Sequence, residues 1–165
     1  MKRVLAWEEL NRLESLGCLQ KVDGPSYLEL HLSVVYSNKW RLVVDASRHL
    51  NPFLRKRTIK LEDLSAMADL VQQDDFLSTD DLDSGYWHMP LHPDMYPYVG
   101  CHMEDPATGW IQYFQWRMLF LGISDMVYIF TKLLRPVVAH LRRISWKGVI
   151  YIDDLGNVNL LVVLF

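Results

Sequence analysis

Two clusters of acidic residues have the type and spacing that could do chemistry. Asp80-Asp81-Leu82-Asp83 ends one apolar, strand-like run, and Tyr151-Ile152-Asp153-Asp154 ends another. Acidic residues are disfavoured inside strands, so both clusters are expected at strand ends. If the two strands are neighbours, Asp81 and the pair Asp153 and Asp154 converge at one rim of a sheet.

Carboxylates that converge in this way could bind divalent metal. Like charges at close range raise one another's pKa unless a cation compensates them, and Mg²⁺ prefers oxygen ligands. Two such ions about 3.5–4 Å apart can activate an attacking oxygen and stabilise a leaving one in phosphoryl transfer. A simpler interpretation remains open at this point, because Asp is common in turns and Asp153-Asp154 would also suit a polar turn between strands.

The apolar pattern predicts the elements that must position these acids. Apolar residues at helical spacing predict helices over Glu8–Leu16, Leu61–Gln72 and roughly 126–141. Pro136 should kink or split the last helix, because an interior proline costs about 3 kcal/mol.

Strands are predicted where β-rich apolar runs are bounded by turn residues. Two hairpins are expected, Val34–Tyr36 with Trp40–Val44 and Val99–Met103 with Trp110–Trp116. Further strands are expected over Phe76–Leu82, Val149–Ile152 and Val158–Phe165, the last two joined through residues 153–157. Helices and strands alternate without a regular βαβ pattern, so the predicted fold class is α+β.

Composition indicates a folded domain rather than a disordered or membrane-spanning chain. Of 165 residues, 50% are apolar and 12% aromatic, enough to build a core. The longest apolar candidate, Met118–Phe130, falls short of the roughly 20 residues that cross a bilayer, so no membrane partner is expected. Cys18 and Cys101 lie far apart and suggest neither a disulfide framework nor a zinc pair, which favours a reducing, intracellular setting.

Charge is segregated along the chain although the net charge is only −3. Residues 39–60 hold seven Lys or Arg and one acid, whereas residues 61–116 hold eleven acids and no Lys or Arg. Residues 132–147 then hold five bases and no acid. This alternation suits a protein that binds phosphates and divalent metal together, although solvated faces that happen to segregate would give the same pattern.

Four ordered motifs resemble those of reverse transcriptases, over a stretch from about Glu8 to Asn157. Tyr151-Ile152-Asp153-Asp154 is similar to the Tyr-x-Asp-Asp box, and Asp81-Leu82-Asp83-Ser84-Gly85-Tyr86 is similar to the Asp-Leu-x-Ser-Gly-Tyr box of retrotransposon polymerases. The other two are Lys39-Trp40-Arg41-Leu42-Val43-Val44-Asp45 with Arg48-His49-Leu50-Asn51, and Phe130-Thr131-Lys132-Leu133-Leu134-Arg135-Pro136. The wording is most like DIRS-type (tyrosine-recombinase) retrotransposons, with gypsy-like elements next.

The resemblance implies a right-hand polymerase fold with fingers and palm and with the thumb missing. Fingers would take in about 1–75 and 93–119, and palm about 76–92 and 120–165. The implied activity is RNA-directed DNA polymerase, with nucleotide transfer to a primer 3′-hydroxyl. Asp81, Asp153 and Asp154 would be the catalytic residues and would hold two Mg²⁺.

The resemblance also implies how nucleotide and nucleic acid are bound. Arg41 would contact the triphosphate, Tyr86 would lie under the deoxyribose, and Gly122 would let the nucleotide approach the backbone closely. A surface cation, a core tyrosine and a turn glycine are the plain alternatives for these residues. Expected partners are an RNA or DNA template–primer duplex, a deoxynucleoside triphosphate and other regions of a longer polyprotein.

Two further interpretations stay open beside the polymerase. Phe120-Leu121-Gly122 stands where the family usually has Pro-Phe-Gly, and Met126-Val127 stands where Ala-Pro is common. Such bulky replacements fit a truncated or decayed copy that folds and binds nucleic acid without catalysis. In the other interpretation, the chain is an interaction module whose acids form only a solvated rim.

Overall fold

The computed structural model describes residues 2–82 and 85–160, which form two compact units. The first unit comprises Met1–Lys56 with Tyr86–Met126, and the second comprises Arg57–Gly85 with Val127–Phe165. Each unit therefore uses two separate stretches of chain. The described elements are helices and antiparallel sheets, an α+β arrangement.

A three-stranded sheet and one long helix form the core of the first unit. The elements are α1 (Lys2–Ser15), β1 (Leu19–Val22), β5 (Gly100–Glu104) and β6 (Ile111–Trp116), with strand order β1-β6-β5. Leu10 and Leu13 of α1 are buried together with Phe114 and Trp116 of β6. The helix begins earlier than the predicted Glu8, whereas the β5–β6 hairpin confirms the sequence-based expectation.

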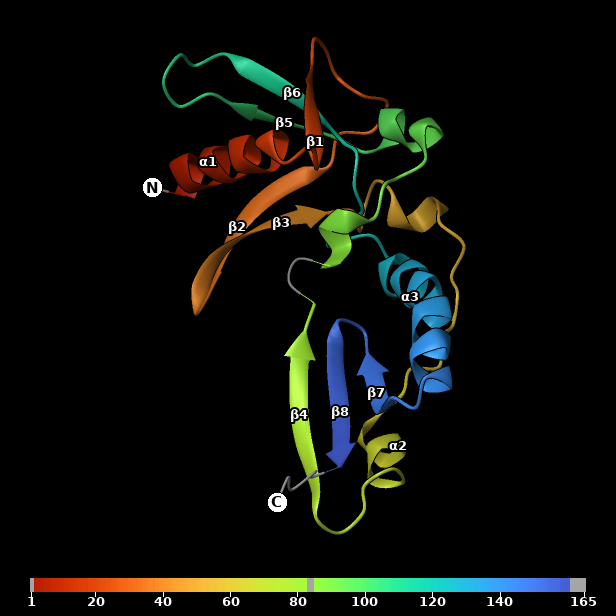
Figure 1. Ribbon diagram of the computed structural model, residues 1–165. Helices are drawn as coiled ribbons and strands as arrows, with labels where there is room; N and C mark the ends of the chain where they lie inside the picture. Colours follow the sequence, from red (N-terminus) through yellow and green to blue (C-terminus); the bar gives the residue numbers. More distant parts are fainter. Residues whose placement is uncertain (1, 83–84, 161–165) are drawn as a thin grey trace. The chain divides into compact units, whose positions relative to one another are not determined.

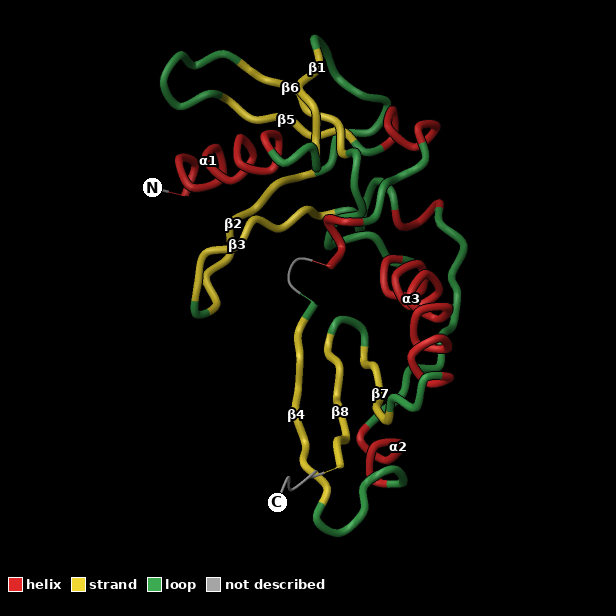
Figure 2. Tube along the Cα trace, in the orientation of Figure 1, coloured by secondary structure: helices red, strands yellow, loops and turns green. Residues whose placement is uncertain are grey.

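A second hairpin in the first unit pairs β2 (His31–Ser37) with β3 (Lys39–Asp45), as predicted (Figure 2). Its tip is Asn38, whose φ is 59°. Asparagine tolerates this left-handed conformation better than most residues. Short 3₁₀ helices complete the chain path, namely η1 (Asn51–Phe53), η2 (Gly85–His88) and η3 (Pro93–Tyr98).

The second unit is built on another three-stranded antiparallel sheet. Its strands are β4 (Asp75–Asp81), β7 (Lys147–Tyr151) and β8 (Asp154–Leu160), in the order β4-β8-β7. Figure 1 shows β8 between its two neighbours, with α3 (Met126–Arg143) and the short α2 (Leu64–Ala68) on the β7 side. Strand β7 is therefore an edge strand among the described residues.

The structure bears on three predicted elements of this unit. Helix α3 is not split at Pro136, so of the two predicted outcomes the kink alone stays a prediction; buried Phe130 and Val138 lie on either side of the proline. Helix α2 is shorter than the predicted 61–72, since two of its supposed core residues, Leu64 and Val71, are exposed. The predicted connector 153–157 is mostly part of β8, and residues 161–165 lie outside the described residues.

The bounds of the two units do not coincide with the predicted fingers and palm ranges, which stay a prediction: residues 86–92 and 120–126 lie in the unit that carries α1. Residues 57–75 belong to the unit that carries β4, rather than to the one that carries α1. Helix α2 packs against this sheet, since a Cβ on Gly156 of β8 would lie 2.6 Å from the Met67 sulfur. Helix α2 thus covers the middle of the β4-β8-β7 sheet.

No helix in the described part of the chain is long and apolar enough to cross a membrane. Cys18 and Cys101 are both buried, free thiols. Burial raises the pKa of Cys101 to about 12.

Candidate active site

Strands β4 and β8 bring the two acidic segments together. Their antiparallel register places Asp81 directly opposite Asp154, and the Leu82 N–H donates to the Asp153 carbonyl at 3.0 Å. Directly opposed residues on antiparallel strands have Cβ atoms about 4.5–5.5 Å apart on the same face. The expectation that the two strands are neighbours is thus confirmed, whereas Asp83 lies outside the described residues.

The two faces of this sheet carry different parts of the acidic clusters. Because side chains alternate along a strand, Asp81 and Asp154 share one face and Asp80 lies on the other. Tyr151 pairs with Asp154 and belongs to the first face. Beside α2 this face borders a cavity of about 590 Å³, which Tyr151 and Asp154 help to line. Asp81 and Asp154 are exposed and Asp153 is half-buried.

The exposed Asp80 is hydrogen-bonded to a buried residue of β8 on the other face of the sheet. Its carboxylate accepts from the Asn157 amide at 2.6 Å, and Asn157 in turn accepts from the Trp146 indole N–H at 2.8 Å. Asn157 is a buried polar residue, so each of these bonds satisfies a group that would otherwise be costly. This network ties the end of β4 to the middle of β8.

The β7–β8 turn that carries Asp153 consists of only two residues, Ile152 and Asp153. Ile152 has a φ of 61°, a conformation in which a β-branched residue is an outlier. In a two-residue hairpin turn, glycine is favoured where φ is positive. The turn therefore stores backbone strain beside the two carboxylates, and such strain clusters at functional sites.

The donor chemistry at this rim fits Mg²⁺, which proteins usually bind through one or two carboxylates plus substrate phosphates. Asp81 and Asp154 offer such a pair, with Asp153 beside them in the turn. Within residues 2–82 and 85–160, no group of three or more His, Cys, Asp or Glu side chains is arranged to hold a metal ion. The rim as it stands provides a two-carboxylate site rather than a complete protein cage.

The predicted nucleotide-binding residues lie in the first unit, whereas the three acids lie in the second. Arg41 is exposed on β3 opposite Val35, and Tyr86 is half-buried in η2. Gly122 has a φ of 126°, and a Cβ there would lie 2.2 Å from the Val44 carbonyl oxygen. The close approach at Gly122 is thus to the chain's own backbone.

Asn51 fixes the loop around Gly122. Its side-chain amide donates to the Gly122 carbonyl, and its side-chain oxygen accepts from the Ser124 N–H, both at 2.9 Å. Asn51 belongs to one of the motifs noted in the sequence, but this role was not predicted.

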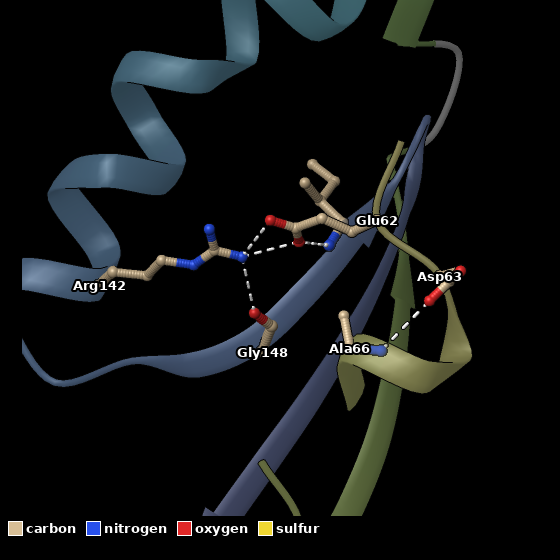
Figure 3. Close-up of polar contacts among 6 residues, drawn as sticks. Glu62, Asp63, Ala66, Arg142 and Gly148 are labelled. Carbon is tan, nitrogen blue, oxygen red and sulfur yellow. Dashed lines mark hydrogen bonds and ion pairs between the residues drawn. The ribbon is translucent and has the colours of Figure 1, made fainter. Parts of the chain in front are cut away.

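Sequence analysis also missed an ion pair between Glu62 and Arg142 (Figure 3). The Arg142 Nη2 atom lies 2.7 Å from both oxygens of the Glu62 carboxylate and 3.1 Å from the Gly148 carbonyl oxygen. The Glu62 carboxylate also accepts from the Ile150 N–H at 3.0 Å. The opposite charges of the two stretches, acidic from 61 and basic from 132, were the available signal.

Comparison with known proteins places the sequence beside a viral one. No protein-family model matches it. The genome polyprotein of Petunia vein clearing virus is 24% identical over 155 residues in isolate Hohn and 26% identical over 155 residues in isolate Shepherd. The chain is similar to one segment of a viral polyprotein. Each match covers 92% of the chain, which spans about 7% of the polyprotein's length.

Proposed function

We propose that this chain is the catalytic core of a retroelement reverse transcriptase, an RNA-directed DNA polymerase. The observation that carries the proposal is the strand register that sets Asp81 opposite Asp154, with Asp153 in the adjoining two-residue turn. This is the placement that the two acidic motifs require if they are to act together. The element type that the motifs favour is DIRS-like, with gypsy-like next.

In this proposal, Asp81, Asp153 and Asp154 hold two Mg²⁺, and the second unit serves as the palm. The ions supply activation of the primer 3′-hydroxyl and stabilisation of the pyrophosphate leaving group. The protein's own work is to hold the acids at one rim and to bind the substrates. Arg41 holds the triphosphate, Tyr86 lies against the deoxyribose, and Gly122 borders the nucleotide, in a first unit that serves as the fingers.

Two further observations support the proposal. The similarity to a viral genome polyprotein extends over nearly the whole chain, which fits a domain that works beside other regions of a longer polyprotein. The basic stretches 39–60 and 132–147 offer cations for the backbones of a template–primer duplex. Such contacts are independent of sequence, so template pairing would select the base.

A domain that binds nucleic acid without catalysis is the second candidate. The observation that favours it is the spacing of the acids: within residues 2–82 and 85–160, no three Asp, Glu, Cys or His side chains lie close enough together to hold a metal ion. The bulky residues Phe120-Leu121 and Met126-Val127 favour it as well. The two candidates share nucleic-acid binding and differ in chemistry.

Primer extension on poly(rA)/oligo(dT) with Mg²⁺ tests the proposal. The chain should extend the primer, and Asp153→Asn should abolish extension because it removes a carboxylate from the rim. Asp23→Asn, at an exposed position after β1, is the matched control and should extend normally. Activity that survives Asp153→Asn would refute the metal-binding role of Asp153. Binding that weakens steeply with salt, without any extension, would favour the second candidate.

A further inference from the structure

Strand β7 has an edge that no other strand covers among the described residues. In an antiparallel pair, alternate residues direct their N–H and C=O groups away from the partner strand. Gly148 and Ile150 are such residues: the Gly148 carbonyl lies against Arg142, and the Ile150 N–H lies against Glu62. Figure 3 shows the contact between Arg142 and Gly148. An ion pair therefore covers the edge where a further strand would pair.

The ion pair joins three segments that are far apart in the sequence. Glu62 directly precedes Asp63, the N-cap of α2, and Arg142 lies in the last turn of α3. Its side chains are only partly exposed, at 43% for Arg142 and 32% for Glu62. Surface ion pairs contribute little by themselves, but this carboxylate and guanidinium also satisfy backbone groups of β7.

The ion pair lies close to one acid-bearing segment and is linked indirectly to the other. On one side, Ile150 immediately precedes Tyr151 and the turn that carries Asp153. On the other side, the Arg142 guanidinium lies 6.0 Å from the ring centre of Trp146, which begins the chain of hydrogen bonds to Asn157 and Asp80. Asp80 is the neighbour of Asp81. The clasp, defined as Glu62 with Arg142, thus contacts β7 directly and is linked to β4 only through Trp146 and Asn157.

We propose that the Glu62–Arg142 clasp is a positioning device that holds the β7–β8 hairpin, and with it Asp153 and Asp154, in register with Asp81. The inference rests on the proposed function, because it assigns the clasp a role in that same site. Glu62 and Arg142 touch neither substrate nor metal in this role. They act through the edge of β7, against the strain of the left-handed Ile152.

The test compares Glu62→Ala, Glu62→Gln, Arg142→Gln and the double variant Glu62→Gln/Arg142→Gln with the wild-type chain. Arg143→Gln, in the same helical turn, and Glu8→Gln, exposed on α1, are the matched controls. Three quantities are measured: chemical unfolding, amide hydrogen exchange of residues 150–154, and the Mg²⁺ concentration that gives half-maximal primer extension. Glu62→Gln keeps an acceptor oxygen for Ile150, so it remains informative if Glu62→Ala fails to fold.

The clasp predicts that Glu62→Ala accelerates exchange at Ile150 at least about tenfold, the equivalent of losing one charge-assisted hydrogen bond. Exchange at residues 151–154 should rise with it, and the half-maximal Mg²⁺ concentration should rise several-fold. The double variant should be no worse than the more affected single variant, since the two side chains act as one unit. The control variants should change none of these quantities.

The proposal would be overturned if the clasp variants have a lower unfolding midpoint but unchanged amide exchange at residues 151–154 and an unchanged Mg²⁺ requirement. A surface ion pair that contributes only to stability would give that result. If the wild-type chain extends no primer, the proposed function fails. The hydrogen-exchange measurement still tests the clasp in that case. Faster amide exchange at residues 151–154 in the clasp variants supports the proposal that the clasp stabilises the hairpin, and unchanged exchange overturns that proposal.

Discussion

Gly122 is a residue at which the backbone leaves no room for a side chain. Its φ of 126° is unfavourable for any L-residue, and a Cβ would lie 2.2 Å from the Val44 carbonyl oxygen. The neighbour is backbone, so it cannot rotate aside. A larger residue at position 122 therefore fits only if the loop around it or strand β3 moves.

We expect Gly122→Ala to lower the free energy of unfolding by about 2–5 kcal/mol, as the sum of backbone strain and overpacking. Gly109→Ala is the matched control, because Gly109 has a φ of 76° but nothing within 4 Å of its Cβ position. In Gly109→Ala, the free energy of unfolding should fall only by the cost of the left-handed backbone, about 1–2 kcal/mol. Denaturant unfolding measures both values, and equal losses would show that the contact with Val44 carries no cost.

Sequence reasoning could single out Gly122 but could not identify what approaches it. Glycine in a loop before a helix signals either a left-handed turn or a close contact, and the family resemblance suggested a nucleotide. The contact partner in the structure, Val44, comes from a distant strand. Pairing of that kind depends on tertiary packing, which local composition does not encode. The role of Gly122 in nucleotide binding stays a prediction.

At the scale of single elements, α2 depends on its cap because it has only five residues. The Asp63 carboxylate accepts from the Ser65 hydroxyl and from the backbone N–H groups of Ser65 and Ala66, at 3.0 and 3.2 Å for the latter two. These hydrogen bonds, first the one from the Ser65 hydroxyl and next the one from the Ala66 N–H, lower the pKa of Asp63 below its usual value.

A lowered pKa in the folded state means that ionised Asp63 stabilises the fold. This contribution is complete above the ordinary Asp pKa of about 3.9 and is lost as the pH falls through the lowered value. Asp63→Ala should therefore lower the unfolding midpoint at neutral pH, and the gap to wild type should narrow in acid.

Asp63→Asn is the matched control, since Asn caps helices about as well but does not titrate. Asp63→Asn should keep most of the wild-type stability at neutral pH. Its unfolding midpoint should lack the acid-induced decrease that comes from protonation of Asp63. Unfolding midpoints at a series of pH values measure both effects. If the difference in unfolding midpoint between Asp63→Ala and wild type stays constant as the pH falls, ionised Asp63 is not what stabilises the fold.

The elements that sequence predicted best are those whose local pattern agrees with their tertiary setting. The β2–β3 and β5–β6 hairpins combine alternating apolar residues with clear turn residues, and both form as predicted. Asp154-Leu155-Gly156-Asn157 reads locally as a turn, yet it forms the first part of β8 because β4 and β7 pair with it on both sides. That pairing is also what brings the candidate site together.

At the scale of the whole molecule, the proposed function predicts that the basic stretches 39–60 and 132–147 contact nucleic acid. Each Lys or Arg that neutralises a phosphate releases counterions, so binding weakens as salt rises, with a slope of about 0.7–0.9 per contact on a logarithmic plot. Arg55 and Lys56 are adjacent, exposed bases of the stretch 39–60.

We expect the double variant Arg55→Gln/Lys56→Gln to reduce that slope by about 1–2 for the poly(rA)/oligo(dT) duplex. The matched control is Arg12→Gln/Lys21→Gln, which removes two bases that are paired with Glu9 and Glu14. The control should leave the slope unchanged. Filter binding at several salt concentrations measures the slopes, and an equal reduction in both double variants would contradict a specific role for the basic stretch.

The division of the chain into two interleaved units was only partly accessible from the sequence. The motifs indicated that two parts exist and that each uses separate stretches. Residues 57–75 lie in the unit that carries β4, where Met67 of α2 approaches Gly156. A glycine in a strand signals close approach, but not by which element.

The isoleucine at the tip of the β7–β8 hairpin has a practical consequence for protein engineering. At the tip of the β2–β3 hairpin the same chain uses asparagine, which suits a positive φ. Anyone redesigning this protein for heat resistance by ordinary rules would replace Ile152 early, with asparagine or glycine. That repair would fall on the residue directly beside Asp153, so a thermostable version made in this way would relax the turn that carries one of the three acids of the proposed site.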